Sequence, residues 1–346
     1  MKRRSNVLDY LQYIVVRLIA MIMAIFPIEV NRAFMRRMAW IWFHLPHSIP
    51  ETRVPAWLAR IPLIGRPMAK VSASGNKLLG KFREHRNRAE EHIRLAMPEL
   101  GMDRTREIAL ASMEQIAMVA VEVLFTPREI TQWTWAQHVR LTKLDEAIRV
   151  LLNRNHGCIM LTGHYGNWEL LGYSLAILGF DMWAVMRPLD NEYINRFLLD
   201  RRERSGLRLL YKKGVTQSAE EILTAKGTLS FIADQNAGAK GLFVDFFGRK
   251  ASTYKSIGLL AIQHEVPIIV GCARRISPRF EYEICVTRII HPHEWKGRED
   301  ELKWITQEYC TAMEQFVREA PEQYLWIHRR WKSRPKEELA AAMSAV

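Results

Sequence analysis

LTGHYGNWELLGYSLA (Leu161–Ala176) is the stretch that decides the fold, because a short apolar run turns into a helix within it. The run GCIMLTG that leads into it is typical of a buried strand, and Asn167 is placed to cap the helix. His164 stands on the turn between strand and helix, and Glu169 lies in the first helical turn. On one continuous helix these two side chains would point in different directions, so a turn is needed to bring them together.

The rest of the chain divides into a helical first part and an alternating second part. From residue 76 to residue 153 the pattern is helical, with a break near Pro98 and a cap at Asp103. Afterwards short apolar strands alternate with helices, and a long helix over residues 299–319 closes the domain. The further strands expected are DMWAVMR, TLSFIAD, VPIIVGCARRI and FEYEICVTRII. This alternation predicts an α/β fold, with a central mixed sheet flanked by helices, over residues 76–346.

The positive charge is concentrated in the first third of the chain. Residues 1–106 hold 19 Lys and Arg against 8 Asp and Glu, a net of +11 out of the +13 of the whole chain. An excess of this kind suits an anionic surface, either lipid headgroups or nucleic acid phosphates.

Residues 1–75 are expected to form an N-terminal membrane-associating helix and connector. The apolar stretch Ile14–Ile28 is 15 residues long, which is shorter than the roughly 20 residues needed to span hydrocarbon, and Arg17 interrupts it. It lacks the small-residue cleavage site of a signal peptide. We expect an interfacial or shallowly inserted helix with basic flanks, and a spanning helix is the alternative.

Aromatic, proline and basic residues mark the segment Trp40–Pro67, which reads as a connector lying across a surface. Trp57 with Arg53, Arg60 and Arg66 suits the headgroup layer of a membrane, and ordinary packing under a loop is the alternative. The four cysteines are far apart, so buried reduced thiols are expected in place of a disulfide framework or a metal site: Cys158, Cys272, Cys285 and Cys310.

The chemistry at the turn follows from the residue types. A histidine paired with a carboxylate acts as a general base towards a hydroxyl group. No Ser or Cys nucleophile accompanies His164, so the hydroxyl would belong to a substrate and an acyl or similar group would be transferred directly. Gly163 and Gly166 allow a sharp bend and close approach of a ligand. Taken alone, the HxxxxE spacing also fits a capping histidine with a surface glutamate.

Four further segments make the pattern more specific. GHYGNWELLG resembles the HxxxxD/E motif of the lysophospholipid acyltransferase superfamily, in the form carried by the bacterial lipid A late acyltransferases, which are lauroyl and myristoyl transferases. The resemblance continues in order through residues 76–335, in the segments HIRLAMPEL, MRPLDNEYINRFLLDRRERSG, FIADQNAGAKGLFVDFFGRKASTYKSIGLLA and APEQYLWIHRRWKSRP. One departure is Asp245, which stands where the family commonly has proline.

The resemblance implies roles for individual residues. His164 would be the general base and Glu169 its partner, and Arg187 would face a phosphorylated acceptor or the developing negative charge. Asp234 and Gln235 would shape the acceptor pocket. The remaining substrate-binding residues that the resemblance implies are Phe246 and Phe247 near the bound chains, and Glu322, His328, Arg329 and Arg330 close to the site. The mechanism would need no metal and no cofactor other than the acyl thioester.

The expected function is that of a membrane-bound O-acyltransferase at the cytoplasmic face of the bacterial inner membrane. It would move a fatty acyl chain from an acyl carrier protein thioester to a hydroxyl of a lipid A precursor or related glycolipid. An acyl-CoA donor, with phosphatidylinositol mannoside or another lysolipid as acceptor, is the alternative. A more distant alternative is a nonenzymatic basic protein that binds membranes or nucleic acid. No nucleic acid partner is expected, because the basic excess coincides with an apolar helix. A serine hydrolase is disfavoured because no GxSxG elbow is present.

Overall fold

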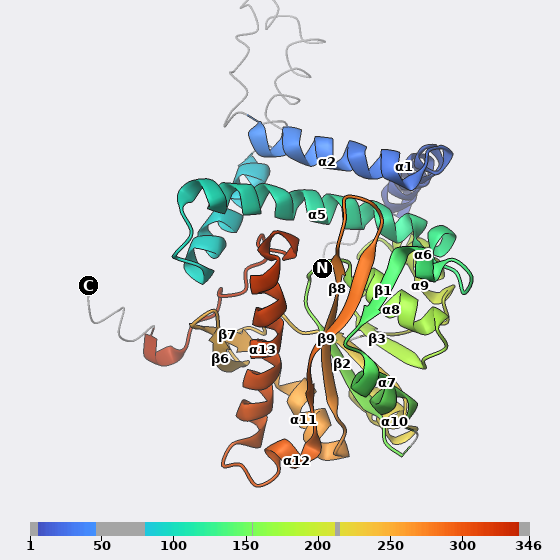
Figure 1. Cartoon of the computed structure of the whole chain (residues 1–346). Coiled ribbons are helices and arrows are strands. Elements are labelled where there is room, and N and C mark those ends of the chain that lie inside the picture. Colours follow the sequence, from blue (N-terminus) through green and yellow to red (C-terminus); the bar gives the residue numbers. More distant parts are fainter. Residues whose placement is uncertain (1–5, 46–79, 154, 212–214, 339–346) are drawn as a thin grey trace, which may run out of the picture.

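A mixed seven-stranded sheet forms the centre of the computed structural model, which describes residues 6–45, 80–153, 155–211 and 215–338 (Figure 1). The strand order is β1-β9-β8-β2-β5-β3-β4, and every neighbouring pair is parallel except β8 and β9. The strands are β1 (Val139–Thr142), β2 (Cys158–Thr162), β3 (Met182–Met186), β4 (Arg208–Tyr211), β5 (Thr228–Ile232), β8 (Ile268–Arg275) and β9 (Tyr282–Ile290). The predicted α/β class, with a mixed sheet flanked by helices, is confirmed.

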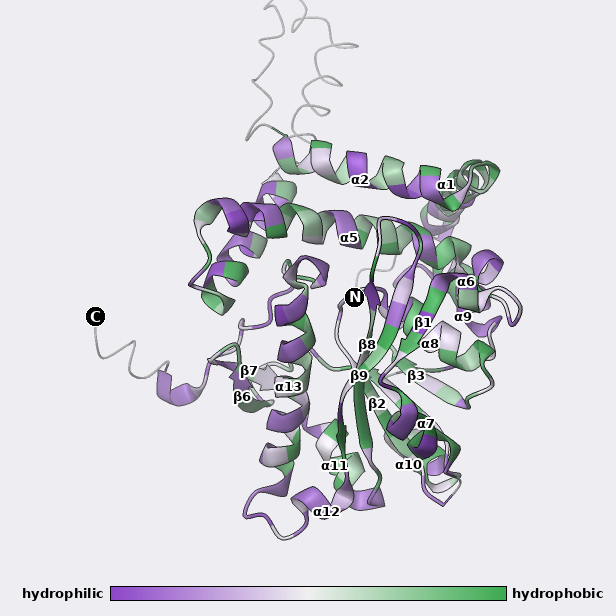
Figure 2. Ribbon diagram, viewed as in Figure 1, coloured by the Kyte–Doolittle hydropathy of each residue, from purple (hydrophilic) through white to green (hydrophobic). Residues whose placement is uncertain are grey.

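Both faces of the sheet are covered, as the apolar strands require. In β2, Ile159 and Leu161 belong to one buried cluster, while Cys158 and Met160 belong to another on the opposite face. The helices of the domain are the segment 80–96 and α5 (Met102–Glu129), α6 (Trp135–His138), α7 (Asp145–Leu152), α8 (Trp168–Ile177), α9 (Glu192–Glu203), α10 (Val215–Thr224), α11 (Lys255–His264), α12 (Pro292–Trp295) and α13 (Glu301–Glu319). Figure 2 shows that the central strands are mostly hydrophobic.

Several elements differ from the expectation. The short strands β1 and β4 were not expected, nor was the separate hairpin of β6 (Leu242–Phe246) and β7 (Arg249–Thr253). At Asp245 the backbone N–H donates to Gln307 Oε1 (2.8 Å), a bond that proline lacks. Helix α5 begins after Gly101, so Asp103 lies in its first turn and is not the cap. The four cysteines are buried and free, as predicted.

Two helices form the N-terminal part: α1 (Asn6–Ile25) and α2 (Ile28–His44), which meet at Pro27. Helix α2 lies along α5 (Figure 1). Helix α1 is long and apolar enough to cross a membrane; α5 also passes that test but is more than half buried in the fold. Residues 40–44 belong to α2, which corrects the expectation of a non-helical connector there. Residues 46–67 of that connector, including Arg53, Trp57, Arg60 and Arg66, and the expected boundary between residues 75 and 76 lie outside the described residues.

A buried carboxylate joins the N-terminal helices to the sheet. Glu122 of α5 is fully buried, and its Oε1 accepts ion-pair contacts from Arg32 Nε and Arg275 Nη1, both at 2.9 Å. Its Oε2 accepts hydrogen bonds from Asn167 Nδ2 (2.8 Å) and the Tyr282 hydroxyl. Arg32 comes from α2, and Asn167 caps α8 by accepting from Leu170 N (2.9 Å), as the sequence predicted. This network therefore ties α2, α5, β8, β9 and the His164 turn together.

The variant Glu122→Gln tests that network. It would leave Arg275 buried without its counter-charge and Arg32 with Glu29 alone (2.7 Å), so we expect the free energy of unfolding to fall by about 3–5 kcal/mol. Chemical unfolding of the detergent-solubilised protein measures this loss. In the control Glu114→Gln, on the same helix, the partner Arg36 is half exposed at 3.4 Å, and a change below about 1 kcal/mol is expected. Equal losses in the two variants would contradict the assignment.

Candidate active site

The parallel register of two neighbouring strands brings His164 and Asp234 together. Thr162 and Ile232 are paired as the last residues of β2 and β5. His164 and Asp234 each lie two residues further on, so they leave the sheet at the same level on the same edge. The carboxyl edge of parallel strands is where ligands bind in open α/β sheets.

The carboxylate of Asp234 holds His164 by two hydrogen bonds. Oδ2 accepts the backbone N–H of His164 (2.8 Å), and Oδ1 lies 2.7 Å from ring Nδ1. Because an ionised carboxylate only accepts, Nδ1 carries a proton and Nε2 is the basic nitrogen. Gly163 lies against this carboxylate, since a Cβ at that position would meet Asp234 Oδ2 at 3.4 Å.

Burial and charge act in opposite directions on this pair. Burial lowers the pKa of His164, but the charge and the hydrogen bond of Asp234, with a smaller contribution from the charge of Glu169, raise the pKa above its ordinary value. Burial likewise raises the pKa of Asp234, and the charge and hydrogen bonds of His164 outweigh it, which lowers the pKa to about 2. The pair is therefore a buried carboxylate beside an unusually basic imidazole.

The free Nε2 side of the imidazole faces polar and aromatic neighbours. Gln235 Nε2 lies 3.3 Å from His164 Nε2 and donates to it. Trp168 packs edge-on against the ring at 5.0 Å between centroids, and His328 stacks parallel to it at 6.3 Å. Within the described part of the chain, His328 Nε2 is buried without a hydrogen-bond partner. This arrangement leaves a base, an amide donor and a second imidazole on one side of the turn.

Backbone packing makes the turn rigid. Gly166 has φ +55°, and a Cβ there would lie 1.9 Å from Ala273 O, so only glycine fits. Its N–H donates to Gln323 O (3.0 Å), and its carbonyl accepts from Gln115 Nε2 (2.8 Å). Leu325 N donates to His164 O (3.0 Å). The glycine thus serves close packing of the main chain, where the sequence had suggested close approach of a ligand.

Glu169 is not the partner of the His164 ring. Its carboxylate is held by Arg202, with Nε to Oε2 at 2.7 Å and Nη2 to Oε1 at 2.5 Å. The bidentate geometry occupies both of its oxygens. The expectation that Glu169 orients the imidazole is thus corrected: Asp234 makes that contact, and Glu169 lies nearby with its own arginine.

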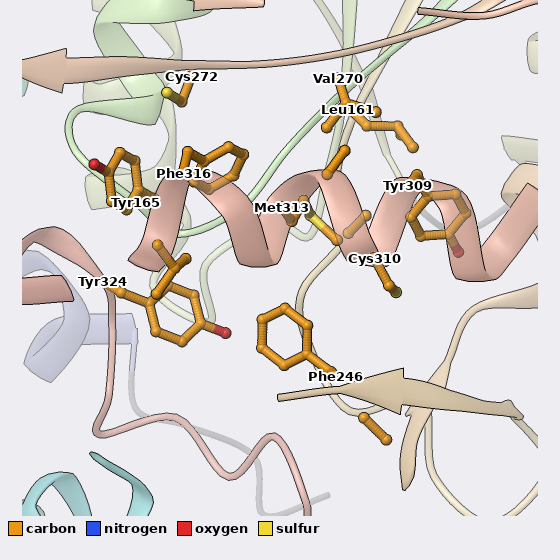
Figure 3. Close-up of a cluster of buried hydrophobic side chains, with 14 of the residues drawn as sticks. Leu161, Tyr165, Phe246, Val270, Cys272, Tyr309, Cys310, Met313, Phe316 and Tyr324 are labelled. Carbon is orange, nitrogen blue, oxygen red and sulfur yellow. The ribbon is translucent and has the colours of Figure 1, made fainter. Parts of the chain in front are cut away.

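Three of the expected substrate-binding residues are buried and make structural contacts. Arg330 is buried and donates to the carbonyls of Gln235 (3.1 Å) and Ser252 (2.7 Å) and to Thr253 Oγ1 (2.8 Å). Phe246 is fully buried, and Figure 3 shows it pointing, with Tyr324, into the cluster packed on α13. Phe247 is also buried and packs edge-on against Phe246 at 4.9 Å. Their role as substrate contacts stays a prediction; in the structure Arg330 fixes the loop that carries Gln235.

The other expected residues lie further out. Arg187 directly follows the last residue of β3 and is exposed. Arg329 is exposed and bound to Glu84 Oε1 (2.7 Å) in the helical segment 80–96. Glu322 lies half-buried in the short turn η1 (Pro321–Gln323). Among the described residues, no group of three or more His, Cys, Asp or Glu side chains is placed to hold a metal ion.

The sequence reasoning missed the role of Arg202 and the direct contact of Asp234 with His164. Arg202 sits in a run of charged residues on α9, where nothing local marks one arginine as the partner of Glu169. For Asp234 a signal existed, because it ends the apolar strand TLSFIAD, and His164 directly follows the apolar strand GCIMLTG. What was absent was the knowledge that these two strands are neighbours.

Comparison with known proteins gives a consistent result. Residues 55–333 match the family described as bacterial lipid A biosynthesis acyltransferase. The lipid A biosynthesis lauroyltransferase of Escherichia coli (strain K12) is 24% identical over 278 residues, covering 75% of this chain and 83% of that protein. The lipid A biosynthesis palmitoleoyltransferase of the same organism is 24% identical over 306 residues, covering 86% and 89%. A lipid A biosynthesis acyltransferase of Haemophilus influenzae is 22% identical over 254 residues, covering 72% and 78%.

Proposed function

Because the chain belongs to the bacterial lipid A biosynthesis acyltransferase family and is therefore an acyltransferase, we propose that it transfers a fatty acyl chain from an acyl carrier protein thioester to a hydroxyl of a lipid A precursor. The observation that carries the proposal is the buried Asp234–His164 pair, whose basic Nε2 faces away from the carboxylate. A base of this kind suits the activation of a hydroxyl group.

The reaction is a direct transfer in two proton movements. His164 Nε2 takes the proton of the acceptor hydroxyl as its oxygen attacks the thioester carbonyl carbon, and a tetrahedral oxyanion forms. Asp234 stabilises the imidazolium that results, since it already accepts the Nδ1 proton. Collapse of the intermediate breaks the carbon–sulfur bond, and the leaving thiolate receives the proton from Nε2. The products are the new ester and the free carrier thiol.

Neighbouring residues have supporting parts in this proposal. The acceptor hydroxyl displaces the Gln235 amide from His164 Nε2, 3.3 Å away, and the freed N–H can then donate to the oxyanion. His328 Nε2, buried without a described partner, is available to the substrate. Glu169 acts through its charge and by holding Arg202, and does not orient the imidazole.

The acyl carrier protein donor is supported by the surface beside the site. The helical segment 80–96 packs on the C-terminal block, where His92 Nδ1 lies 2.9 Å from Trp326 O and Arg88 Nη1 donates to Ile327 O (3.3 Å). The exposed charged residues of this segment are Lys81, Arg83 and Arg94 together with Glu84 and Glu91. Glu84 is paired with Arg88 and Arg329, so the surface keeps a positive excess. A carrier protein that is strongly acidic would meet complementary charge on this segment.

We propose further that the protein lies on the cytoplasmic face of the inner membrane with α1 in the plane of the surface. Helix α1 contacts the body of the protein near both ends, through Asn6 Oδ1 with the Tyr193 hydroxyl (3.2 Å) and Ala24 O with Arg128 Nη1 (3.4 Å). A helix held in this way along its length supports in-plane binding over spanning. Helix α2 adds an exposed apolar stripe at helical spacing, which we call the α2 stripe: Val30, Phe34, Met38 and Ile41.

The central test is acyl transfer from carrier protein thioesters to a lipid A precursor, with product mass as the readout. His164→Ala is expected to lose roughly 100-fold or more of the activity, the scale of general base catalysis. The control His156→Ala, which alters a histidine at the opposite end of β2, should keep it. Full activity of His164→Ala would overturn the mechanism.

The pH dependence gives a second prediction. The neutral imidazole is the active form, and its pKa is raised above the ordinary value of about 6.5. As the pH is lowered, the wild-type rate should therefore start to fall while the pH is still above about 6.5.

The α2 stripe gives a separate prediction. Phe34→Asp with Met38→Asp should weaken binding to lipid vesicles by at least about 10-fold, because two large apolar side chains no longer enter the bilayer. Vesicle flotation measures this. Leu259→Asp, which changes an exposed residue of α11, is the control. If the control weakens binding as strongly, or if the double variant binds normally, α2 is not a membrane contact.

A further inference from the structure

Two arginines from different helices share one aromatic ring where α1 meets α9. The guanidinium carbon of Arg17 lies 5.0 Å from the centre of the Phe197 ring, and that of Arg201 lies 4.6 Å from it. Phe197 itself is buried. Cation–π contacts of this kind hold each guanidinium in place, but they bring two like charges to the same ring.

Among the described residues these two charges have no acidic partner, whereas neighbouring arginines do. Arg202 pairs with Glu169, Arg196 with Glu192 and Arg208 with Asp181. Within the described part of the chain, no Asp or Glu pairs with Arg17, Arg201 or Arg204. The contacts of Arg17 and Arg201 are with neutral acceptors: Arg17 Nη1 donates to the Tyr13 hydroxyl (3.1 Å) and Arg201 Nη1 to Leu124 O (2.9 Å).

The electrostatics of Arg201 reflect this imbalance. Its Nε is buried without a hydrogen-bond partner among the described residues. Burial, followed by the charges of Arg204 and Arg17, lowers the pKa of Arg201 below its ordinary value. Arg204 is the C-cap residue of α9, three residues after Arg201. An anion bound beside these guanidinium groups would offset the repulsion, and Arg is well suited to bind phosphate through several N–H groups at once.

The position of the cluster connects the lipid-facing surface with the catalytic histidine. On α1, the apolar residues around Arg17 are exposed, including Val15 and Leu18. On α9, Arg201 lies beside Arg202, and both line one small hollow with Glu169, whose charge reaches His164. A group bound at the cluster would therefore lie at headgroup depth and close to the active site.

We propose that Arg17, Arg201 and Arg204 form a binding site for a phosphate group of a lipid headgroup. The inference rests on the proposed function, because the phosphate that best fits this position is that of the acceptor glycolipid, which the site would hold while its hydroxyl reaches His164. A phosphate of a membrane phospholipid has the same chemistry and is the other source.

The experiment compares Arg17→Gln and Arg204→Gln with the wild type, since both residues are exposed and their replacement leaves the contacts of the half-buried Arg201 intact. The matched control is Arg196→Gln, an exposed arginine of α9 that pairs with Glu192. Transfer is measured with a lipid A precursor and with the same lipid after its phosphates have been removed. Binding is measured separately, with phosphatidylcholine vesicles that contain or lack phosphatidylglycerol.

For the acceptor as the source, each variant should raise KM for the phosphorylated lipid by roughly 10-fold, the scale of a lost charge-assisted hydrogen bond. The kcat, and the KM for the dephosphorylated lipid, should stay within about twofold, which a merely structural defect would not allow. Unchanged KM with a similar loss of affinity for phosphatidylglycerol vesicles alone would keep the phosphate site and assign it to a membrane phospholipid.

The proposal is overturned if neither KM nor vesicle affinity changes, or if Arg196→Gln has the same effects. Failure of the proposed function looks different, because the wild type would then acylate none of the acceptors while the vesicle experiment still tests the arginine cluster on its own.

Discussion

The carboxylate of Asp234 is the group on which the active site depends, because one oxygen binds the main chain of His164 and the other binds its ring. The first bond fixes where the turn leaves β2, and the second fixes the tautomer of the imidazole. Asp234 is almost completely buried, so its charge is little screened and acts strongly on the histidine. A single buried carboxylate therefore sets both the position and the basicity of the proposed catalytic base.

A second buried carboxylate supports the same turn from behind. Glu122 binds Asn167, three residues after His164, and also Arg32 of α2. The opposite side of α2 carries the α2 stripe. The apolar surface that we propose to meet the membrane and the turn that carries the proposed base are thus linked through one residue of α5.

The local parts of the fold could be predicted from the sequence, and the long-range contacts could not. The strand, turn and helix around His164 follow from apolar pattern, glycine and the Asn167 cap, all of which act within a few residues. The contact of Asp234 with His164 depends on β2 and β5 being neighbours, and 70 residues separate the pair. Arg330 illustrates the same limit. A basic run predicts a solvated or phosphate-binding surface, yet Arg330 lies in the interior, where it donates hydrogen bonds to two carbonyl oxygens and one hydroxyl. The short strands β1 and β4, four residues each, have too few apolar positions to show a period.

The central claim is that Asp234, and not Glu169, orients the His164 imidazole and makes the largest contribution to its raised pKa. The most direct measurement is an NMR titration of this imidazole in three proteins: wild type, Asp234→Asn and Glu169→Gln. In the wild type we expect the neutral ring to carry its proton on Nδ1 and none on Nε2, and its pKa to lie above the ordinary histidine value. Asp234→Asn should lower this pKa clearly, because it removes the nearest charge, whereas Glu169→Gln should lower it less. A larger fall with Glu169→Gln than with Asp234→Asn, or a wild-type ring protonated on Nε2 alone, would contradict the account.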